Sequence, residues 1–405
     1  MRLDSASPMN AKAGLRAGYH LSYLDGLRAL ASLYVVFFHA GLGFVGACAA
    51  GAAGVDCVGG IWIRTAQRVL SFGHDAVAVF IVLSGYCLML PVARAQGIIV
   101  RGVPSYFARR AWRILPPYFA ALFGTLLLLR GLPILETPTK TIWDDTSPAF
   151  AVGPIVSHLL LVHNWFPAWT HRINGPLWSV ATEWQIYFFF PLFLLPIWRR
   201  FGALLTVVSG FALGSSLIWL APGAASSINS WYLGLFALGM VAAGVGFAER
   251  AEERALRERA PWGLITLSLL GAVGLGITVL IRRWFVMMPL SDSLVGATTA
   301  SALVYLTRGA LGPEGAARPL ILRVLESAPL VALGRFSYSL YLTHLPVVAL
   351  CYFGLRRYAL SPDARWSWLV ALSLPLSLSF SYAFFWVFER RFVGSPPPLF
   401  AKRSA

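Results

Sequence analysis

Residues 24–42, LDGLRALASLYVVFFHAGL, form an apolar run long enough to cross a bilayer, yet the run contains Arg28 and His39. With about 3.6 residues per turn, their separation is almost three whole turns, so both side chains project from one helix face, about 16 Å apart along the axis. An ionisable group in the middle of a membrane is costly unless it faces a cavity or a partner. The alternative is an Arg that snorkels to the surface and a His that is packed in the bundle. The shared face favours a functional pair.

The composition is that of a membrane protein. Of the 405 residues, 58% are hydrophobic and only 12% are charged, and the mean hydropathy is +0.68. In soluble domains, roughly a quarter of the residues are charged. Apolar segments separated by basic loops predict an all-α, polytopic membrane protein with about ten transmembrane helices. The predicted spans are 27–46, 74–91, 112–131, 177–197, 201–220, 231–247, 262–281, 289–307, 337–355 and 367–388.

The positions of Lys and Arg predict the orientation. They cluster in both tails and in the loops after every second span, which places the N- and C-termini in the cytoplasm. This topology also accounts for the net charge of +16, so we expect no nucleic acid as a partner. Arginine is used far more than lysine, which is typical of a GC-rich bacterial gene. We therefore expect a multi-pass protein of the bacterial plasma (inner) membrane.

We expect one membrane domain, residues 24–391, between cytoplasmic tails at 1–23 and 392–405. The longest outer connection is 132–176, in which 154–163 is too short to span and predicts a re-entrant or interfacial helix. Cys48 and Cys57 share one polar loop, and whether they form a disulfide depends on the compartment that this loop faces. No metal site is expected.

Other predicted spans also contain polar residues. His74 and Asp75 open the second span, either as an exposed helix start with an acidic residue at its positive end or as functional groups. Glu183 lies about two turns inside the fourth span, where a lone carboxylate is expensive. Tyr341 and His344 share a helix face in the ninth span, and a packed, hydrogen-bonded His344 is an equal alternative to a functional one.

Small and basic residues have two interpretations as well. Ser84 and Gly85 predict a close helix contact, because small residues let membrane helices approach each other. Arg109, Arg110 and Arg113 lie just before or at the start of the third span. They are explained either by topology alone or by a site that binds phosphates through bidentate contacts.

Five motifs occur in a fixed order: LDGLRALA…FFH, VFIVLSGY, RRAWRILPPY, PLWSVATEW…FPL and GRFSYSLYLTH. Together they resemble the acyltransferase 3 family of integral membrane O-acyltransferases, over about residues 22–391. The resemblance implies about ten transmembrane helices. It also implies transfer of an acyl group, usually acetyl from cytoplasmic acetyl-CoA, to a hydroxyl of a sugar, glycan, lipid or macrolide-type glycoside.

The family's motifs fall on individual residues of this chain. Its Arg-x10-His motif matches Arg28 and His39, and its Arg-x-x-Arg motif matches Arg110 and Arg113. The remaining matches are Trp178, Ser179 and Glu183 in the fourth span, and Ser337, Tyr338 and His344 in the ninth. The second-span motif departs from the family's pattern, because Ala76 and Ala78 replace its usual Gly and Asp.

The resemblance and the polar residues together predict an acyl-CoA-dependent O-acyltransferase. His39 is the expected general base, since an ordinary histidine pKa of about 6.5 suits proton transfer at neutral pH. Direct acylation of its imidazole remains an open alternative. Glu183 is expected to orient His39 or to bind the acceptor, and His344 to assist. The acyl-CoA residues are Arg28, Arg109, Arg110 and Arg113, and the acceptor residues are His74, Asp75, Trp178, Ser179 and Tyr341.

We expect acetyl-CoA as a co-substrate, no permanently bound cofactor, and the lipid bilayer as a partner. The acceptor is expected to be a hydroxyl-bearing envelope polysaccharide or glycoside, although the residues specify neither its identity nor the acyl chain length. The alternative from another class is a secondary transporter whose buried His, Glu and Arg couple transport to protons.

Overall fold

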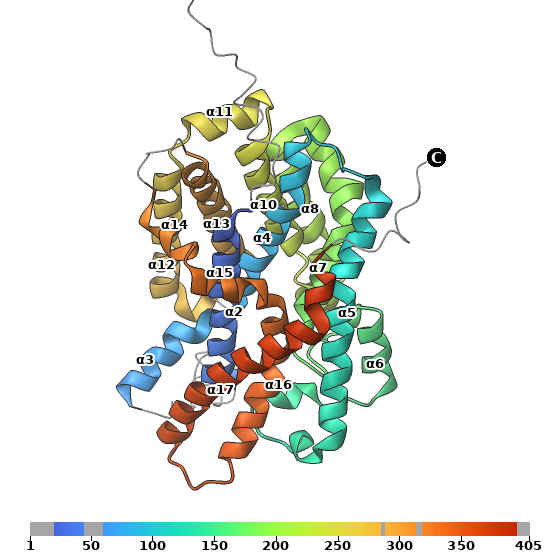
Figure 1. Cartoon of the computed structure of the whole chain (residues 1–405), viewed down its shortest axis with the longest axis vertical. Helices are drawn as coiled ribbons and strands as arrows, with labels where there is room; N and C mark the ends of the chain where they lie inside the picture. Colours follow the sequence, from blue (N-terminus) through green and yellow to red (C-terminus); the bar gives the residue numbers. More distant parts are fainter. Residues whose placement is uncertain (1–19, 44–59, 285–287, 313–317, 395–405) are drawn as a thin grey trace, which may run out of the picture.

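The computed structural model describes residues 20–43, 60–284, 288–312 and 318–394 (Figure 1). Every regular element within these ranges is a helix, which confirms the all-α prediction. The possible Cys48–Cys57 disulfide and most of both predicted tails lie outside the described residues.

Each predicted span coincides with one of the longer helices. These are α2 (Ser22–Phe38), α4 (Gly73–Arg94), α5 (Gly102–Gly131), α7 (Leu177–Phe189), α8 (Leu195–Leu220), α10 (Tyr232–Phe247), α12 (Trp262–Trp284), α13 (Met288–Ala310), α16 (Ser337–Leu355) and α17 (Pro362–Phe384). By length and hydropathy, 5 helices of the described chain qualify as membrane spans, or up to 7 if each of two bent helix pairs is one span. A membrane protein is therefore supported, and ten crossings stay a prediction.

The stretch Leu177–Leu220 is a helical run of 44 residues, longer than one crossing of a hydrocarbon core about 30 Å thick requires. Its backbone breaks at Gly202, where φ is +83°. Glycine adopts this left-handed conformation without the steric cost that a side chain would add. The break lies beside Arg199 and Arg200, where the sequence predicts the basic turn between two spans.

Shorter helices connect the long ones. They are α3 (Ile61–Val69), α6 (Val152–Leu159), α9 (Pro222–Ile228), α11 (Ala251–Arg259), α14 (Leu320–Leu325) and α15 (Ala328–Arg335). In Figure 1, α11 and the α4–α5 connection lie at one end, whereas α3 and the α16–α17 turn lie at the other. This grouping agrees with the predicted alternation of loops, and the side that faces the cytoplasm remains a prediction.

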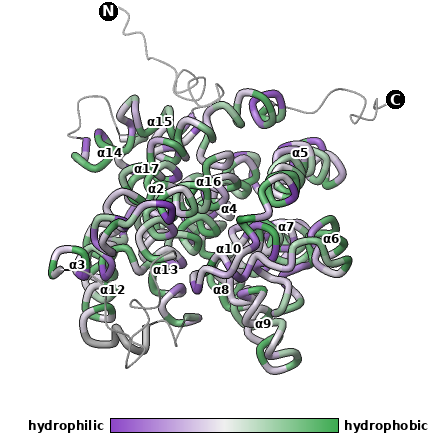
Figure 2. Tube along the Cα trace, turned by 90° about the horizontal axis from the view of Figure 1, so that it is seen from below, coloured by the Kyte–Doolittle hydropathy of each residue, from purple (hydrophilic) through white to green (hydrophobic). Residues whose placement is uncertain are grey.

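Hydrophobic side chains occur outside the bundle as well as inside it. Leu127 of α5 is 74% exposed and Val152 of α6 is 77% exposed, and Figure 2 shows hydrophobic residues along both of these outer helices. A surface of this kind suits lipid rather than water.

The inner helices cross closely. A Cβ atom added to Gly85 would lie 2.1 Å from the carbonyl oxygen of Phe236, and one added to Gly239 would lie 2.0 Å from that of Val82. These two glycines therefore let α4 and α10 pack backbone to backbone, and the predicted close contact at Gly85 is confirmed.

Candidate active site

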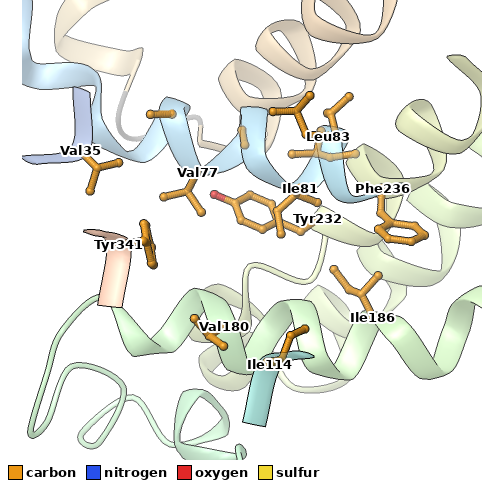
Figure 3. Packing of buried hydrophobic residues seen from close by; sticks show 14 of the residues in the cluster. Val35, Val77, Ile81, Leu83, Ile114, Val180, Ile186, Tyr232, Phe236 and Tyr341 are labelled. Atoms are coloured by element: carbon orange, nitrogen blue, oxygen red, sulfur yellow. The ribbon is translucent and has the colours of Figure 1, made fainter. Parts of the chain in front are cut away.

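A cavity of about 290 Å³ lies between α2, α4, α5, α7 and α16. Figure 3 shows the apolar part of its surroundings, with Val77 and Ile81 on α4 across from Val180 on α7 and Ile114 on α5. The polar part of the wall unites residues that are far apart in the sequence. Six of the predicted site residues line it, namely Arg28, Arg110, Arg113, Ser179, Glu183 and Tyr341.

The arginines give the cavity a positive charge. Arg28 donates to Asp25 Oδ1 at 3.0 Å and approaches Cys87 Sγ at 3.0 Å. Among the described residues, Arg110 and Arg113 make no hydrogen bond, and the buried Nε of Arg110 has no partner. Guanidinium groups left in this state suit an anionic ligand such as a phosphate.

Arg109 does not line the cavity. Its Nη1 donates to the Ser105 hydroxyl at 2.5 Å, one helical turn earlier on α5, and its Nη2 lies 3.4 Å from the carbonyl oxygen of Val100. The three clustered arginines of the sequence are thus separated by the helix into two that face the cavity and one that does not.

Glu183 is the negative group of the cavity. The Tyr187 hydroxyl donates to its Oε1 at 2.5 Å, and the same hydroxyl lies 3.2 Å from Ser84 Oγ. Arg28 is close enough to interact electrostatically with this carboxylate. Glu183 is predicted to orient His39 or to bind the acceptor, whereas its hydrogen-bond partner in the structure is Tyr187.

His39 contacts another histidine. Its Nδ1 lies 2.9 Å from the carbonyl oxygen of Val35 and 3.1 Å from Nε2 of His344. Nδ1 of His344 lies 2.8 Å from the carbonyl oxygen of Tyr341. A carbonyl oxygen can only accept, so both Nδ1 atoms carry the proton, and His344 Nε2 accepts from His39. The lone pair of His39 is therefore on Nε2, the nitrogen that a base or nucleophile would use.

Backbone geometry changes at His39. The α-helix of α2 ends at Phe38, and a short π-helical segment, His39–Gly43, begins there. Such π-helical turns often occur at functional sites. Arg28 and His39 thus lie on one continuous helix up to this point, as the spacing predicts.

Tyr341 joins the cavity to the histidine pair. Its ring centroid lies 5.9 Å from that of His344, and its hydroxyl lies 2.6 Å from Ser179 Oγ. The two histidines are not among the residues that line the cavity. They lie directly beside its wall.

The predicted acceptor residues fall into separate groups. Ser179 and Tyr341 line the cavity. His74 lies elsewhere, with Nε2 3.1 Å from Asp292 Oδ2 and 3.1 Å from the Tyr232 hydroxyl. The Trp178 ring stacks on His74, with centroids 5.8 Å apart. Asp75, the remaining member of the predicted set, is buried on α4.

Asp292, Tyr187 and Tyr232 are not among the site residues predicted from the sequence. A signal for Asp292 was present, because an acidic residue inside the predicted span 289–307 marks a functional candidate by the same argument that identified Glu183. Tyrosines in apolar helices carry no comparable signal. Within the described residues, no three His, Cys, Asp or Glu side chains are grouped as metal ligands.

Comparisons with known proteins identify the family of the chain. A family model described as an acyltransferase domain matches residues 21–386. Acyltransferase MdmB of Streptomyces mycarofaciens is 25% identical over 298 residues, which cover 69% of this chain and 70% of the relative. No solved structure shows significant similarity. Since the family match covers most of the chain and several helices qualify as membrane spans, the protein belongs to the acyltransferase 3 family and is a membrane enzyme that transfers acyl groups.

Proposed function

We propose that the protein transfers an acyl group, acetyl in the first instance, from cytoplasmic acyl-CoA to a hydroxyl of a sugar, glycan or glycoside. The observation that carries this proposal is the histidine pair beside a cavity lined by three arginines. A positive cavity suits the phosphorylated donor, and a histidine with its lone pair on Nε2 suits proton abstraction from a hydroxyl.

The donor would occupy the arginine side of the site. Arg110 and Arg113 have unused donors for the phosphates of CoA, and Arg28, which lines the same cavity, would contact a phosphate or the pantetheine arm. Arg109 lies outside the cavity, so we assign it a smaller part in binding.

The chemical step follows from the protonation of the histidines. His39 Nε2 would take the proton of the acceptor hydroxyl as the oxygen attacks the thioester carbonyl. When the C–S bond breaks, the imidazolium would return this proton to the leaving thiolate, so the histidine is regenerated. His344 would stabilise the imidazolium by accepting from Nδ1–H. In the covalent alternative, Nε2 attacks the thioester carbonyl, the C–S bond breaks and the CoA thiolate leaves. The acceptor hydroxyl then attacks the acyl-histidine, the C–N bond breaks, and the hydroxyl proton ends on the CoA thiol, which regenerates the histidine.

We place the enzyme in the bacterial plasma membrane, with the donor approaching from the cytoplasm and the acceptor from the envelope side. The transporter alternative is not retained, because the family to which the chain belongs is one of acyltransferases.

The test uses purified protein in lipid nanodiscs, radiolabelled acetyl-CoA, and an extract of the host's envelope glycans and glycosides. His39→Ala should slow label transfer by about a hundredfold or more, the usual contribution of a positioned base. The same variant should bind acetyl-CoA as the wild type does, because His39 does not line the cavity.

A second variant separates donor binding from chemistry. Arg110→Gln should weaken acetyl-CoA binding, measured by equilibrium dialysis, because it removes an unpaired cation from the cavity. Equal transfer by wild type and His39→Ala would remove His39 from the mechanism. Absence of transfer by folded wild-type protein with several acyl donors would refute the proposed function as a whole.

A further inference from the structure

Asp292 is a buried carboxylate near the start of α13. Its side chain is 0% exposed. Oδ2 accepts from Trp231 Nε1 at 2.8 Å and pairs with His74 Nε2 at 3.1 Å. Oδ1 is buried and has no hydrogen-bond partner among the described residues.

Holding helices together is a weak explanation for this group. Removing a carboxylate from water is expensive, and well-packed apolar side chains of similar volume are often as stabilising as a buried ion pair. An unpaired buried oxygen adds to the cost. A function that needs the charge is the better explanation.

The His74–Asp292 pair is fully buried at the carboxylate and partly exposed at the imidazole. While the carboxylate is fully buried, 21% of the His74 side chain is exposed. Asp292 accepts from Nε2, so the carboxylate orients the ring and leaves its Nδ1 edge for another partner. Within the described residues, Nδ1 makes no hydrogen bond. The ring of Trp178 stacks against one face of the His74 imidazole.

The helix start that carries His74 packs against the end of α2, where His39 lies. A Cβ atom on Gly73 would lie 2.2 Å from the ring of Phe38, so the residues that precede His74 and His39 are in direct contact. The rings of Phe38 and His39 are themselves 4.9 Å apart.

The surroundings of His74 and Asp292 differ in charge from the donor cavity. The hydrogen-bond and ion-pair partners of His74 and Asp292 include no arginine in the described chain. A place that contains a carboxylate and no arginine does not attract phosphates, whereas an imidazole nitrogen is a good partner for a hydroxyl, which both donates and accepts.

We propose that the His74–Asp292 pair is the acceptor subsite. His74 Nδ1 contacts a hydroxyl of a neutral polyhydroxyl acceptor, and Asp292 is the positioning residue that fixes the ring. This inference rests on the proposed function and adds to it the place of the acceptor, away from the arginines that line the donor cavity.

The test measures label transfer from radiolabelled acetyl-CoA to a dilution series of the envelope extract. This series yields an apparent acceptor KM without knowledge of the acceptor's structure. Asp292→Asn and His74→Gln should each raise the acceptor KM about tenfold or more, as expected for loss of an oriented hydrogen bond. The KM for acetyl-CoA should stay within about twofold of the wild-type value, because neither residue lines the donor cavity.

Thr307→Val is the matched control. Thr307 Oγ1 lies 2.6 Å from the Tyr86 hydroxyl, so it also joins α13 to α4, at the other end of α13 from Asp292. If the acceptor KM of Thr307→Val rises as much as that of Asp292→Asn, the increase results from loosened helix packing and the inference is wrong. An unchanged acceptor KM in His74→Gln, with wild type active, also overturns it. An inactive wild type instead refutes the proposed function, and the subsite with it.

Discussion

Replacing His344 tests the role assigned to the histidine pair. His344→Leu removes the nitrogen that accepts from His39 Nδ1 while it keeps an apolar side chain in a fully buried position. His344→Gln restores an acceptor, because a glutamine Oε1 reaches roughly as far as the histidine Nε2. The two variants therefore differ chiefly in the contact at issue.

The expected magnitude follows from what remains in the structure. The carbonyl oxygen of Val35 still accepts from His39 Nδ1, so the lone pair stays on Nε2 and the base is not lost. What disappears is one hydrogen bond to a group that becomes charged in the transition state, about 1.5–3 kcal/mol. This corresponds to roughly a ten- to hundredfold decrease in kcat for His344→Leu.

The assay is the initial rate of label transfer at saturating acetyl-CoA and acceptor extract, with acetyl-CoA binding and thermal unfolding measured on the same preparations. His344→Leu should be slower than wild type and faster than His39→Ala, and His344→Gln should recover most of the rate. A kcat for His344→Leu within about twofold of wild type would refute the role of His344. Equal loss in the Leu and Gln variants, both folded, would refute the hydrogen-bond argument.

Two further predictions concern the cavity and the helix packing. Arg113→Gln should raise the KM for acetyl-CoA about tenfold, because a charge-assisted contact is lost. Arg109→Gln should raise it less, since Arg109 lies outside the cavity. Equal increases of the KM in acetyl-CoA titrations of the two variants would contradict this division. Gly239→Ala should lower the free energy of unfolding by about 1–3 kcal/mol or more, because its Cβ would lie 2.0 Å from a backbone oxygen of α4. Gly271→Ala, with nothing within 4 Å of the added atom, is the control and should not lower the thermal unfolding temperature.

Much of the fold was predictable because apolar segments in a membrane have few alternatives to the helix. Periodicity also placed Arg28 and His39 on one helix, and the cost of a buried carboxylate identified Glu183. The same cost argument applied to Asp292 and was not used there. Gly85 was interpretable as a close contact because it lies in a membrane helix, where small residues favour such crossings.

Pairwise contacts between distant segments were not predictable. His39 and His344 are 305 positions apart, and His74 and Asp292 are 218 apart. Helical periodicity reports which face a side chain occupies, but it does not say which other helix that face meets. The same limit applies to Arg109, Arg110 and Arg113, because the spacing alone does not say which of them faces the cavity.

The sequence by itself determined the helical membrane architecture, the family and the residue types available for chemistry. These follow from local composition, spacing and motif order, which act within one segment at a time. Only the tertiary structure decided that His344 is the partner of His39, that Tyr187 is the partner of Glu183, and that His74 pairs with Asp292. Such pairings depend on the close approach of α4 to α10 and of the first helix to its neighbours, which is a property of the whole bundle.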